Sequence, residues 1–172
     1  LSLCNGLTLV FASDEQTVNP ILLAEFFKEN NVDAFNSTPS RLLQYMELDE
    51  FAETMANCKV ILSGGEKYPD KLLRILREKT NATKINTYGP TEITVSSNAK
   101  NLTNADEISI GRPLRNYTEY IVDSDNNLLP IGDVGEILIQ GCGVALGYNK
   151  LPEQTAKAFI EFNGERTYRS GD

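Results

Sequence analysis

The residues best suited to chemistry form one short run, Asn86-Thr87-Tyr88-Gly89-Pro90-Thr91-Glu92, directly after a predicted strand. This run combines an aromatic ring, hydroxyls and a carboxylate. Tyr88 can stack on a flat base, Thr91 can donate to a phosphate oxygen, and Glu92 offers the hard oxygen that magnesium prefers. A nucleoside triphosphate needs all three groups, although Gly-Pro is also typical of a plain tight turn.

The composition narrows the possible chemistry. The 172 residues carry 16 Lys and Arg against 24 Asp and Glu, a formal charge of −8, which disfavours nucleic-acid binding. With no histidine, the chain cannot form a Ser-His-Asp or Cys-His catalytic group by itself. Three cysteines without Cys-x-x-Cys spacing indicate free thiols in a reducing compartment. Because we find no signal segment and no membrane-length apolar run, we expect a cytoplasmic protein without membrane contacts.

The elements that must position this run alternate between strands and helices. We expect strands at residues 7–11, 33–36, 59–62 and 84–87, with helices beginning at Asn19-Pro20, Thr38-Pro39 and Pro69. Residues 1–4 are expected to be the end of a further helix. This alternation predicts an α/β fold with a mainly parallel sheet and flanking helices, whose ligands bind beyond the carboxyl ends of the strands.

After Gly111-Arg112-Pro113 the pattern changes to short strands separated by glycine-rich turns. We expect strands at residues 117–122, 128–129 and 135–140, and one helix from Pro152 to about Phe159. This pattern predicts a small β-rich, distorted barrel-like subdomain. We therefore divide the chain into an α/β subdomain, residues 1–108, and a β-rich subdomain, residues 109–172, and expect the two to pack together.

Three segments, in order, resemble core motifs of the adenylate-forming enzymes. They are the run Asn86–Glu92, the stretch Gly135-Glu136-Ile137-Leu138-Ile139-Gln140-Gly141-Cys142-Gly143-Val144-Ala145-Leu146-Gly147-Tyr148, and Tyr168-Arg169-Ser170-Gly171-Asp172. Gly64-Gly65-Glu66 and Ile110-Gly111-Arg112-Pro113 agree as well, so the resemblance covers essentially the whole chain. The chain is most similar to amino-acid adenylation domains of nonribosomal peptide synthetases. Acyl- or aryl-CoA ligases, D-alanine carrier-protein ligases and a noncatalytic nucleotide-binding or interaction module remain alternatives.

The resemblance implies that ATP and Mg2+ bind at these motifs. Asn86 and Tyr88 would meet the adenine, Thr91 the α-phosphate and Glu92 the metal, which makes Thr91 and Glu92 the catalytic residues. Asp172 would accept hydrogen bonds from both ribose hydroxyls. The other implied nucleotide-binding residues are Gly64, Gly65, Glu66, Thr87 and Gly89. For residues 64–66, a strand-to-helix turn that needs positive φ explains the glycines equally well, and the glycines at 141, 143 and 147 are expected to be architectural.

The resemblance also implies a substrate and partners. In the parent enzyme, a substrate carboxylate would attack the α-phosphorus of ATP, and the acyl group would then pass to the phosphopantetheine thiol of a carrier-protein domain. The implied acyl-pocket residues are Asn36, Ile61, Ser63, Thr87, Val95 and Ser96, whose polarity favours a small polar amino acid such as threonine, serine or cysteine. The phosphate loop and the C-terminal lobe would lie outside this chain. The rest of its own adenylation domain is thus an expected partner, without which the chain should be inactive.

Overall fold

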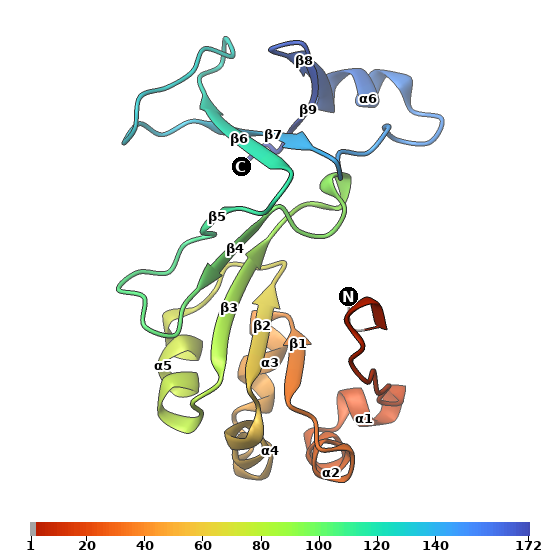
Figure 1. Cartoon of the computed structure of the whole chain (residues 1–172), viewed down its shortest axis with the longest axis vertical. Helices are drawn as coiled ribbons and strands as arrows, with labels where there is room; N and C mark the ends of the chain where they lie inside the picture. The colour runs from red at the N-terminus through yellow and green to blue at the C-terminus, as the bar shows by residue number, and fades with distance from the viewer. Residues whose placement is uncertain (1–2) are drawn as a thin grey trace. The chain divides into compact units, whose positions relative to one another are not determined.

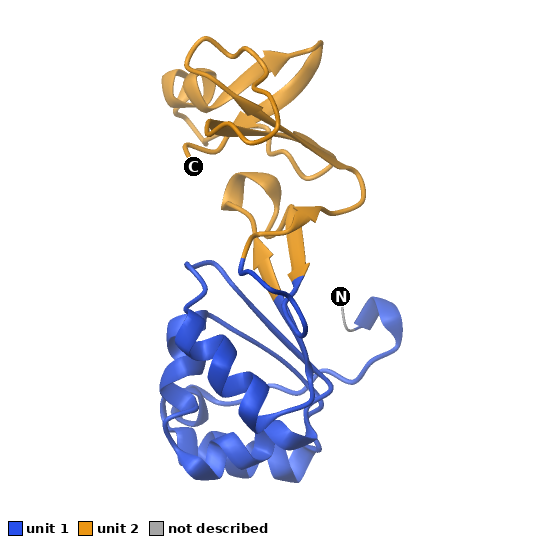
Figure 2. Ribbon diagram, turned by 90° about the vertical axis from the view of Figure 1, so that its left-hand side faces the viewer, with its two compact units in different colours: residues 1–85, 101–108 blue, residues 86–100, 109–172 orange. Residues whose placement is uncertain are grey.

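The computed structural model describes residues 3–172, which fold into two compact units (Figure 2). The first unit runs to Ile85 and includes residues 101–108, and the second contains residues 86–100 and 109–172. The run Asn86–Glu92 therefore belongs to the unit built by the C-terminal strands, whereas the sequence placed it in the part that ends at residue 108. Leu1 and Ser2, from the predicted helix end, lie outside the described residues.

The first half of the chain alternates helices and strands, as expected (Figure 1). Predicted helix starts at Asn19-Pro20 and Thr38-Pro39 are confirmed, because each proline occupies the first turn of a helix. None of the helices within residues 3–172 is long and apolar enough to cross a bilayer. The elements are η1 (Leu3–Asn5), α1 (Asp14–Val18), α2 (Pro20–Asn30), β1 (Ala34–Ser37), α3 (Pro39–Tyr45), α4 (Asp49–Thr54), η2 (Met55–Asn57), β2 (Val60–Gly64), α5 (Asp70–Lys79) and β3 (Thr83–Tyr88).

These strands belong to a mixed five-stranded sheet with the order β1-β2-β3-β4-β5, where β4 is Asn98–Asn101 and β5 is Arg112–Pro113. Strands β1 and β2 are parallel, with Phe35 opposite Ile61, and Thr83 at the start of β3 donates to the Lys59 carbonyl at 2.8 Å. Strands β4 and β5 pair antiparallel. The predicted α/β class with flanking helices is confirmed, and the antiparallel edge is an addition to it.

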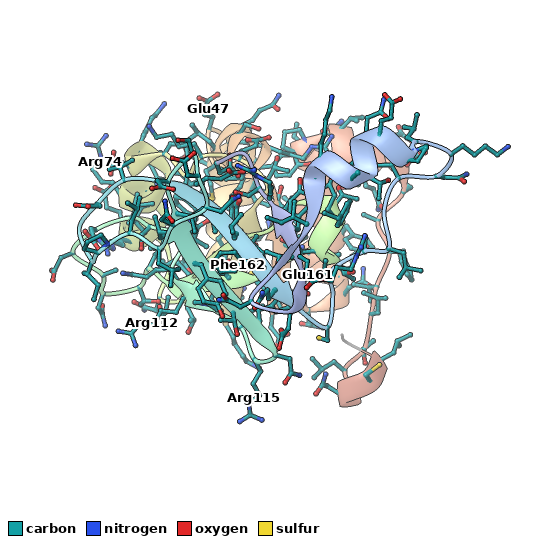
Figure 3. The ribbon with its side chains drawn as sticks, turned by 90° about the horizontal axis from the view of Figure 1, so that it is seen from above. Glu47, Arg74, Arg112, Arg115, Glu161 and Phe162 are labelled. Carbon is teal, nitrogen blue, oxygen red and sulfur yellow. The ribbon has the colours of Figure 1, made fainter. Side chains whose placement is uncertain are left out.

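The core of the first unit lies between its strands and its helices. In Figure 2 these helices lie on one side of the strands. Aromatic rings form its centre: Phe27 lies 5.0 Å from Phe35 and 5.3 Å from Phe51 between ring centroids. Leu72 and Leu76 on α5 are fully buried, which confirms the apolar face predicted for this helix. Charged side chains such as those of Glu47 and Arg74 point outward (Figure 3).

The second unit is built on a four-stranded antiparallel sheet with the order β6-β7-β9-β8. Its strands are β6 (Tyr117–Val122), β7 (Glu136–Gly141), β8 (Phe159–Phe162) and β9 (Glu165–Arg169), with α6 (Pro152–Ala158) before β8. Although β6 and β8 are the outer strands, the rings of Tyr120 and Phe162 lie 5.2 Å apart. The sheet is therefore strongly curled, in agreement with the barrel-like expectation.

Two predicted strands are wrong and several elements were missed. Residues 7–11 form no strand within the described chain; Leu7 and Phe11 are exposed there, because alternation alone does not supply a pairing partner. Leu128 makes only an isolated bridge to Val122, so residues 128–129 are not a strand. The short pairs β4–β5 and β8–β9, and helix α4, were not predicted, since each contains few residues and little periodicity.

Gly143 is one of the three glycines that we expect to be architectural, and this role can be tested. A Cβ there would lie 2.5 Å from the Ile93 carbonyl oxygen and 1.9 Å from the Tyr117 hydroxyl. Gly143→Ala should therefore destabilise the second unit by about 3 kcal/mol through overpacking, measured as a lowered thermal unfolding midpoint. Gly132→Ala measures the other cost of replacing a glycine, because its φ is +104° and an added Cβ meets nothing within 4 Å, so only backbone strain is introduced. A Gly143→Ala protein as stable as the wild type would contradict the steric explanation.

Candidate nucleotide-binding site

The end of β3 carries the run predicted to bind nucleotide, and its backbone is tightly fixed. Asn86 is only 5% exposed and donates from Nδ2 to the Ser109 carbonyl at 2.9 Å, so its amide holds a neighbouring loop in place. At Gly89, an added Cβ would lie 2.5 Å from the Ser96 Cα. Glycine is required there because the chain passes directly behind it. Thr87 and Tyr88 are partly exposed, and Thr91 is exposed.

Two predicted nucleotide-binding residues that are far apart in sequence meet directly. The Tyr88 hydroxyl donates to Oδ2 of Asp172 at 2.5 Å. Burial, followed by this bond to the carboxylate, raises the pKa of the Tyr88 phenol, so the phenol remains a donor at neutral pH. The run after β3 and the end of the chain therefore contribute to one site within the second unit.

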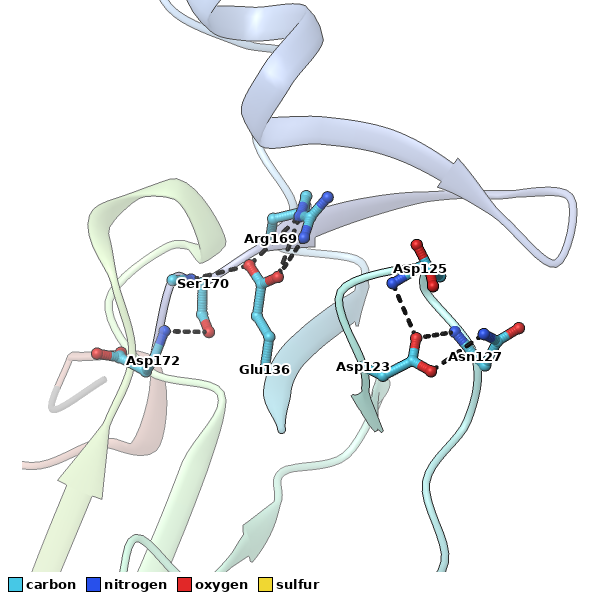
Figure 4. Close-up of polar contacts among 8 residues, drawn as sticks. Asp123, Asp125, Asn127, Glu136, Arg169, Ser170 and Asp172 are labelled. Carbon is cyan, nitrogen blue, oxygen red and sulfur yellow. Dashed lines mark hydrogen bonds and ion pairs between the residues drawn. The ribbon is translucent and has the colours of Figure 1, made fainter. Parts of the chain in front are cut away.

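Asp172 is placed by contacts with the start of β7 (Figure 4). The Arg169 guanidinium forms an ion pair with Glu136, through both Nε and Nη2. The same carboxylate accepts the Gly171 N–H at 3.2 Å, and the Ile137 N–H donates to the Asp172 carbonyl at 3.1 Å. Arg169 holds the pKa of Glu136 below its usual value. This side-chain and backbone pairing holds the segment 169–172 against β7.

Glu92 is joined to the second motif at two points. Its carbonyl accepts the Ala145 N–H at 2.7 Å, and its Oε1 accepts the Tyr148 hydroxyl at 2.6 Å. The next residue, Ile93, is fully buried in the core of the second unit and anchors the short helix η3 (Thr91–Ile93). A single fixed carboxylate suits Mg2+, which usually takes one or two protein carboxylates together with substrate phosphates. Glu92 thus fits the metal role that its residue type predicted.

Directly after Glu92 the backbone adopts an unusual conformation. Thr94 and Val95 have φ values of +62° and +73°, a region that β-branched residues rarely occupy. The Thr94 hydroxyl donates to the Gly143 carbonyl at 2.8 Å, which helps to hold this turn. The Val95 side chain is 79% exposed. Backbone strain of this kind concentrates at binding sites, and Val95 was one of the predicted acyl-pocket residues.

The predicted acyl-pocket residues fall in both units. Thr87, Val95 and Ser96 belong to the second unit, and Asn36, Ile61 and Ser63 belong to the first. Ile61 and Ser63 are buried, and the Ser63 hydroxyl donates to the Ser37 carbonyl at 2.9 Å. Asn36 is opposite Leu62 in the register, so it lies on the other face of the sheet from Ile61 and Ser63. The pocket itself stays a prediction.

The segment Gly64-Gly65-Glu66 has a clear structural role. Gly65 has a φ of +83°, and an added Cβ would meet nothing within 4 Å, so the turn conformation is sufficient to explain this glycine. Glu66 accepts the Ser40 N–H at 3.1 Å and the Ser40 hydroxyl at 3.0 Å. These bonds lower the pKa of Glu66 and place its charge at the N-terminus of α3. A role in nucleotide binding stays a prediction.

Three residues of this site were not singled out from the sequence: Glu136, Tyr148 and Arg169. All three lie inside the stretches that carry the family resemblance. Their residue types indicated a role at the site, since charged and aromatic residues inside a motif commonly contact a ligand or the side chains that hold it. The pairing of Glu136 with Arg169, or of Tyr148 with Glu92, depends on strand register and could not be read from spacing.

Comparison with known proteins defines the class. A profile of AMP-binding enzymes matches residues 1–149, so the chain belongs to the AMP-binding enzyme family. It is 33% identical over 172 residues, 97% of this chain, to gramicidin S synthase 2 of Aneurinibacillus migulanus, of which it spans only 4%. The resemblance to nonribosomal peptide synthetase adenylation domains is thereby confirmed.

Two solved structures agree with this assignment. One is the four-domain nonribosomal peptide synthetase holo-AB3403, bound to AMP and glycine, with 32% identity and a TM-score of 0.85 over 94% of this chain and 12% of that chain. The other is holo-PA1221, which contains adenylation and PCP domains, with 26% identity and a TM-score of 0.81 over 90% of this chain and 28% of that chain. The two-part fold described above is therefore the fold of this family.

Removing the Glu136 carboxylate should loosen the end of the chain in a pH-dependent manner. At pH 7, Glu136→Gln is expected to lower stability by about 1–3 kcal/mol, as loss of a hydrogen-bonded charge does. Because the folded pKa lies below the usual 4.5, the stabilisation is complete above pH 4.5 and is lost as the pH falls through the lowered pKa. The difference between wild type and variant should therefore shrink in acid.

Thermal unfolding from pH 7 to pH 3 and hydrogen exchange at the Gly171 amide measure these effects. Glu161→Gln is a matched control, because Glu161 is an exposed carboxylate on β8 of the same sheet (Figure 3). A pH-independent loss of stability in Glu136→Gln would contradict the ion-pair explanation.

Proposed function

We propose that this chain forms part of an enzyme that activates an amino acid with ATP, giving aminoacyl-AMP and pyrophosphate. The observation that carries the proposal is the contact of Tyr88 with Asp172, which brings two predicted nucleotide-binding residues 84 positions apart into one site. Glu92 lies in the same unit, four residues after Tyr88. A base-stacking ring, a ribose-binding carboxylate and a metal-binding carboxylate together match an adenosine phosphate.

The proposed reaction suits a chain without histidine. An amino-acid carboxylate is already ionised at pH 7, so no general base is needed to generate the nucleophile. Its oxygen forms a bond to the α-phosphorus, and the bond from that phosphorus to the bridging oxygen breaks, with the electron pair leaving on pyrophosphate. Catalysis then depends on position and charge stabilisation. Thr91, exposed at the start of η3, would donate to an α-phosphate oxygen.

Glu92 would hold Mg2+, which, when bound, neutralises charge on the phosphates. The protein's contribution at this point is a carboxylate whose backbone and side chain are both fixed, by Ala145 and Tyr148 respectively. Asp172 would accept the ribose hydroxyls, and the face of Tyr88 would contact the adenine. Asn86 supports the run from behind through its bond to Ser109.

We further propose that the activated amino acid passes to the thiol of a phosphopantetheine group on a carrier-protein domain. The thiolate would attack the acyl carbon, and AMP would leave. The similarity to holo-PA1221, described as containing adenylation and PCP domains, supports this second step. The rest of the adenylation domain would supply the groups that this chain lacks, which include the predicted phosphate loop.

Substitution of Asp172 tests the nucleotide site. In the full-length protein, Asp172→Asn should weaken AMP binding about tenfold, because one charge-assisted hydrogen bond to the ribose is lost. Isothermal titration with AMP and with 2′,3′-dideoxy-AMP separates this effect from a general loss of folding. The variant and the wild type should bind the dideoxy nucleotide equally well. A tenfold loss for both nucleotides would contradict the ribose contact.

Amino-acid-dependent exchange of pyrophosphate into ATP tests the activity and its substrate. The full-length protein should catalyse this exchange with a small polar amino acid, for which threonine, serine and cysteine are the candidates. This choice comes from the polarity of the predicted pocket residues, because a site built to hydrogen-bond a hydroxyl rejects analogues without one by large factors. Exchange with only large apolar amino acids would reject the substrate class. Absence of exchange with every amino acid would reject the activity.

A further inference from the structure

The Glu92 carboxylate is held from one side by the loop that follows β7. The Tyr148 hydroxyl donates to Glu92 Oε1 at 2.6 Å, and the Ala145 N–H donates to the Glu92 carbonyl at 2.7 Å. One loop therefore fixes both the backbone and the side chain of Glu92. Most glutamate side chains on a surface are free to change rotamer, so this double attachment needs an explanation.

Tyr148 is itself fixed by its surroundings. Its N–H donates to the Thr155 hydroxyl of α6 at 2.9 Å, and its ring packs edge-on against Phe159 at 5.5 Å between centroids. The neighbouring Gly147 has a φ of +138°, and an added Cβ would lie 2.4 Å from Thr155 Cγ2. The loop thus lies directly on α6, which leaves the phenol little freedom to move.

The chemistry of the two groups fixes the direction of this bond. An ionised carboxylate only accepts hydrogen bonds, whereas a phenol hydroxyl can donate one, so Tyr148 is the donor and Glu92 the acceptor. Tyr168, which is 7% exposed, packs its ring 5.3 Å from that of Phe159 and so belongs to the same aromatic cluster.

We propose that Tyr148 is a positioning residue that orients the Glu92 carboxylate toward the Mg2+ ion of the nucleotide. This inference rests on the proposed function, in which Glu92 is the metal ligand. A carboxylate has about four lone-pair sites, so it can accept the phenol and still bind a cation. A ligand that is already ordered loses less conformational entropy when the metal binds. Outer-shell partners of this kind usually affect metal affinity by 10–100-fold.

The test removes one oxygen atom. In the full-length protein, Tyr148→Phe keeps the ring against Phe159 but removes the donor to Glu92. The Mg2+ concentration for half-maximal ATP–pyrophosphate exchange should rise about tenfold, with a smaller change in the rate at saturating Mg2+. A binding measurement is independent of activity: calorimetry should show unchanged ATP affinity without Mg2+ and a reduced gain in affinity when Mg2+ is added.

Two variants control for structural effects. Tyr120→Phe removes a phenol hydroxyl from β6 in the same unit, outside the Glu92 cluster, and should leave the Mg2+ dependence unchanged. Val122→Ala should lower the thermal unfolding midpoint by opening a cavity at a fully buried position of β6, outside the cluster that contains Tyr148. If loss of stability alone raised the Mg2+ requirement, Val122→Ala would raise it as much as Tyr148→Phe does, and the proposal would be overturned.

Glu92→Gln and the double variant separate this proposal from the proposed function. If Glu92→Gln leaves the Mg2+ dependence unchanged, Glu92 is not the metal ligand and both ideas fail together. If Glu92→Gln changes it and Tyr148→Phe does not, only the positioning role is overturned. In the Glu92→Gln background, Tyr148→Phe should have no further effect on Mg2+, since its role acts through that carboxylate. A full additional effect would overturn the proposal.

A second variant applies if Tyr148→Phe does not fold. Thr155→Val removes the hydroxyl that accepts the Tyr148 N–H and leaves the phenol in place. It should raise the Mg2+ requirement by a smaller factor than tenfold, again without an effect on ATP affinity in the absence of Mg2+. An unchanged Mg2+ requirement in a folded Thr155→Val protein would then count against the positioning role.

Discussion

The site depends on carboxylates of the second unit that neutral and cationic donors of the same unit hold in place. Asp172 accepts the Tyr88 hydroxyl, Glu92 accepts the Tyr148 hydroxyl, and Glu136 pairs with Arg169. An exposed glutamate or aspartate has many rotamers, so these contacts reduce the entropy lost when a ligand binds. Tyr88 ends β3, Tyr148 lies in the loop after β7 and Arg169 ends β9, so segments far apart in sequence cooperate within the second unit.

The negative charge of the site explains why a metal cation is expected there. The chain carries a net charge of −8, and two of the carboxylates that contribute to it, Glu92 and Asp172, would lie beside a polyanionic nucleotide. The guanidinium of Arg169, three residues before Asp172, is already paired with Glu136. The triphosphate therefore needs another positive charge, and Mg2+ on Glu92 would supply it. The acidic composition that argues against nucleic-acid binding is consistent with a nucleotide site that uses a cation.

The sequence predicted the elements that have a strong local signal. Strand 117–122 and the helix starts at Pro20 and Pro39 agree with the structure, because alternation and first-turn prolines act locally. Residues 7–11 have a strand-like pattern but no partner. The run Asn86–Glu92 was recognised, yet its membership of the second unit was not, since it follows from contacts such as Tyr88 with Asp172 that are 84 residues apart.

The strained turn at Thr94 and Val95 connects the proposed metal ligand with a residue proposed to contact the amino acid. Ile93 is buried in the core and Glu92 is bonded to the loop after β7, so the chain must reverse sharply in the next two residues. Left-handed conformations in two β-branched residues cost free energy, about 1–2 kcal/mol each. The bond from Thr94 to Gly143 offsets part of this cost. The turn leaves Val95 exposed three residues after Glu92, so the contacts that fix the proposed metal ligand also set the position of this second residue.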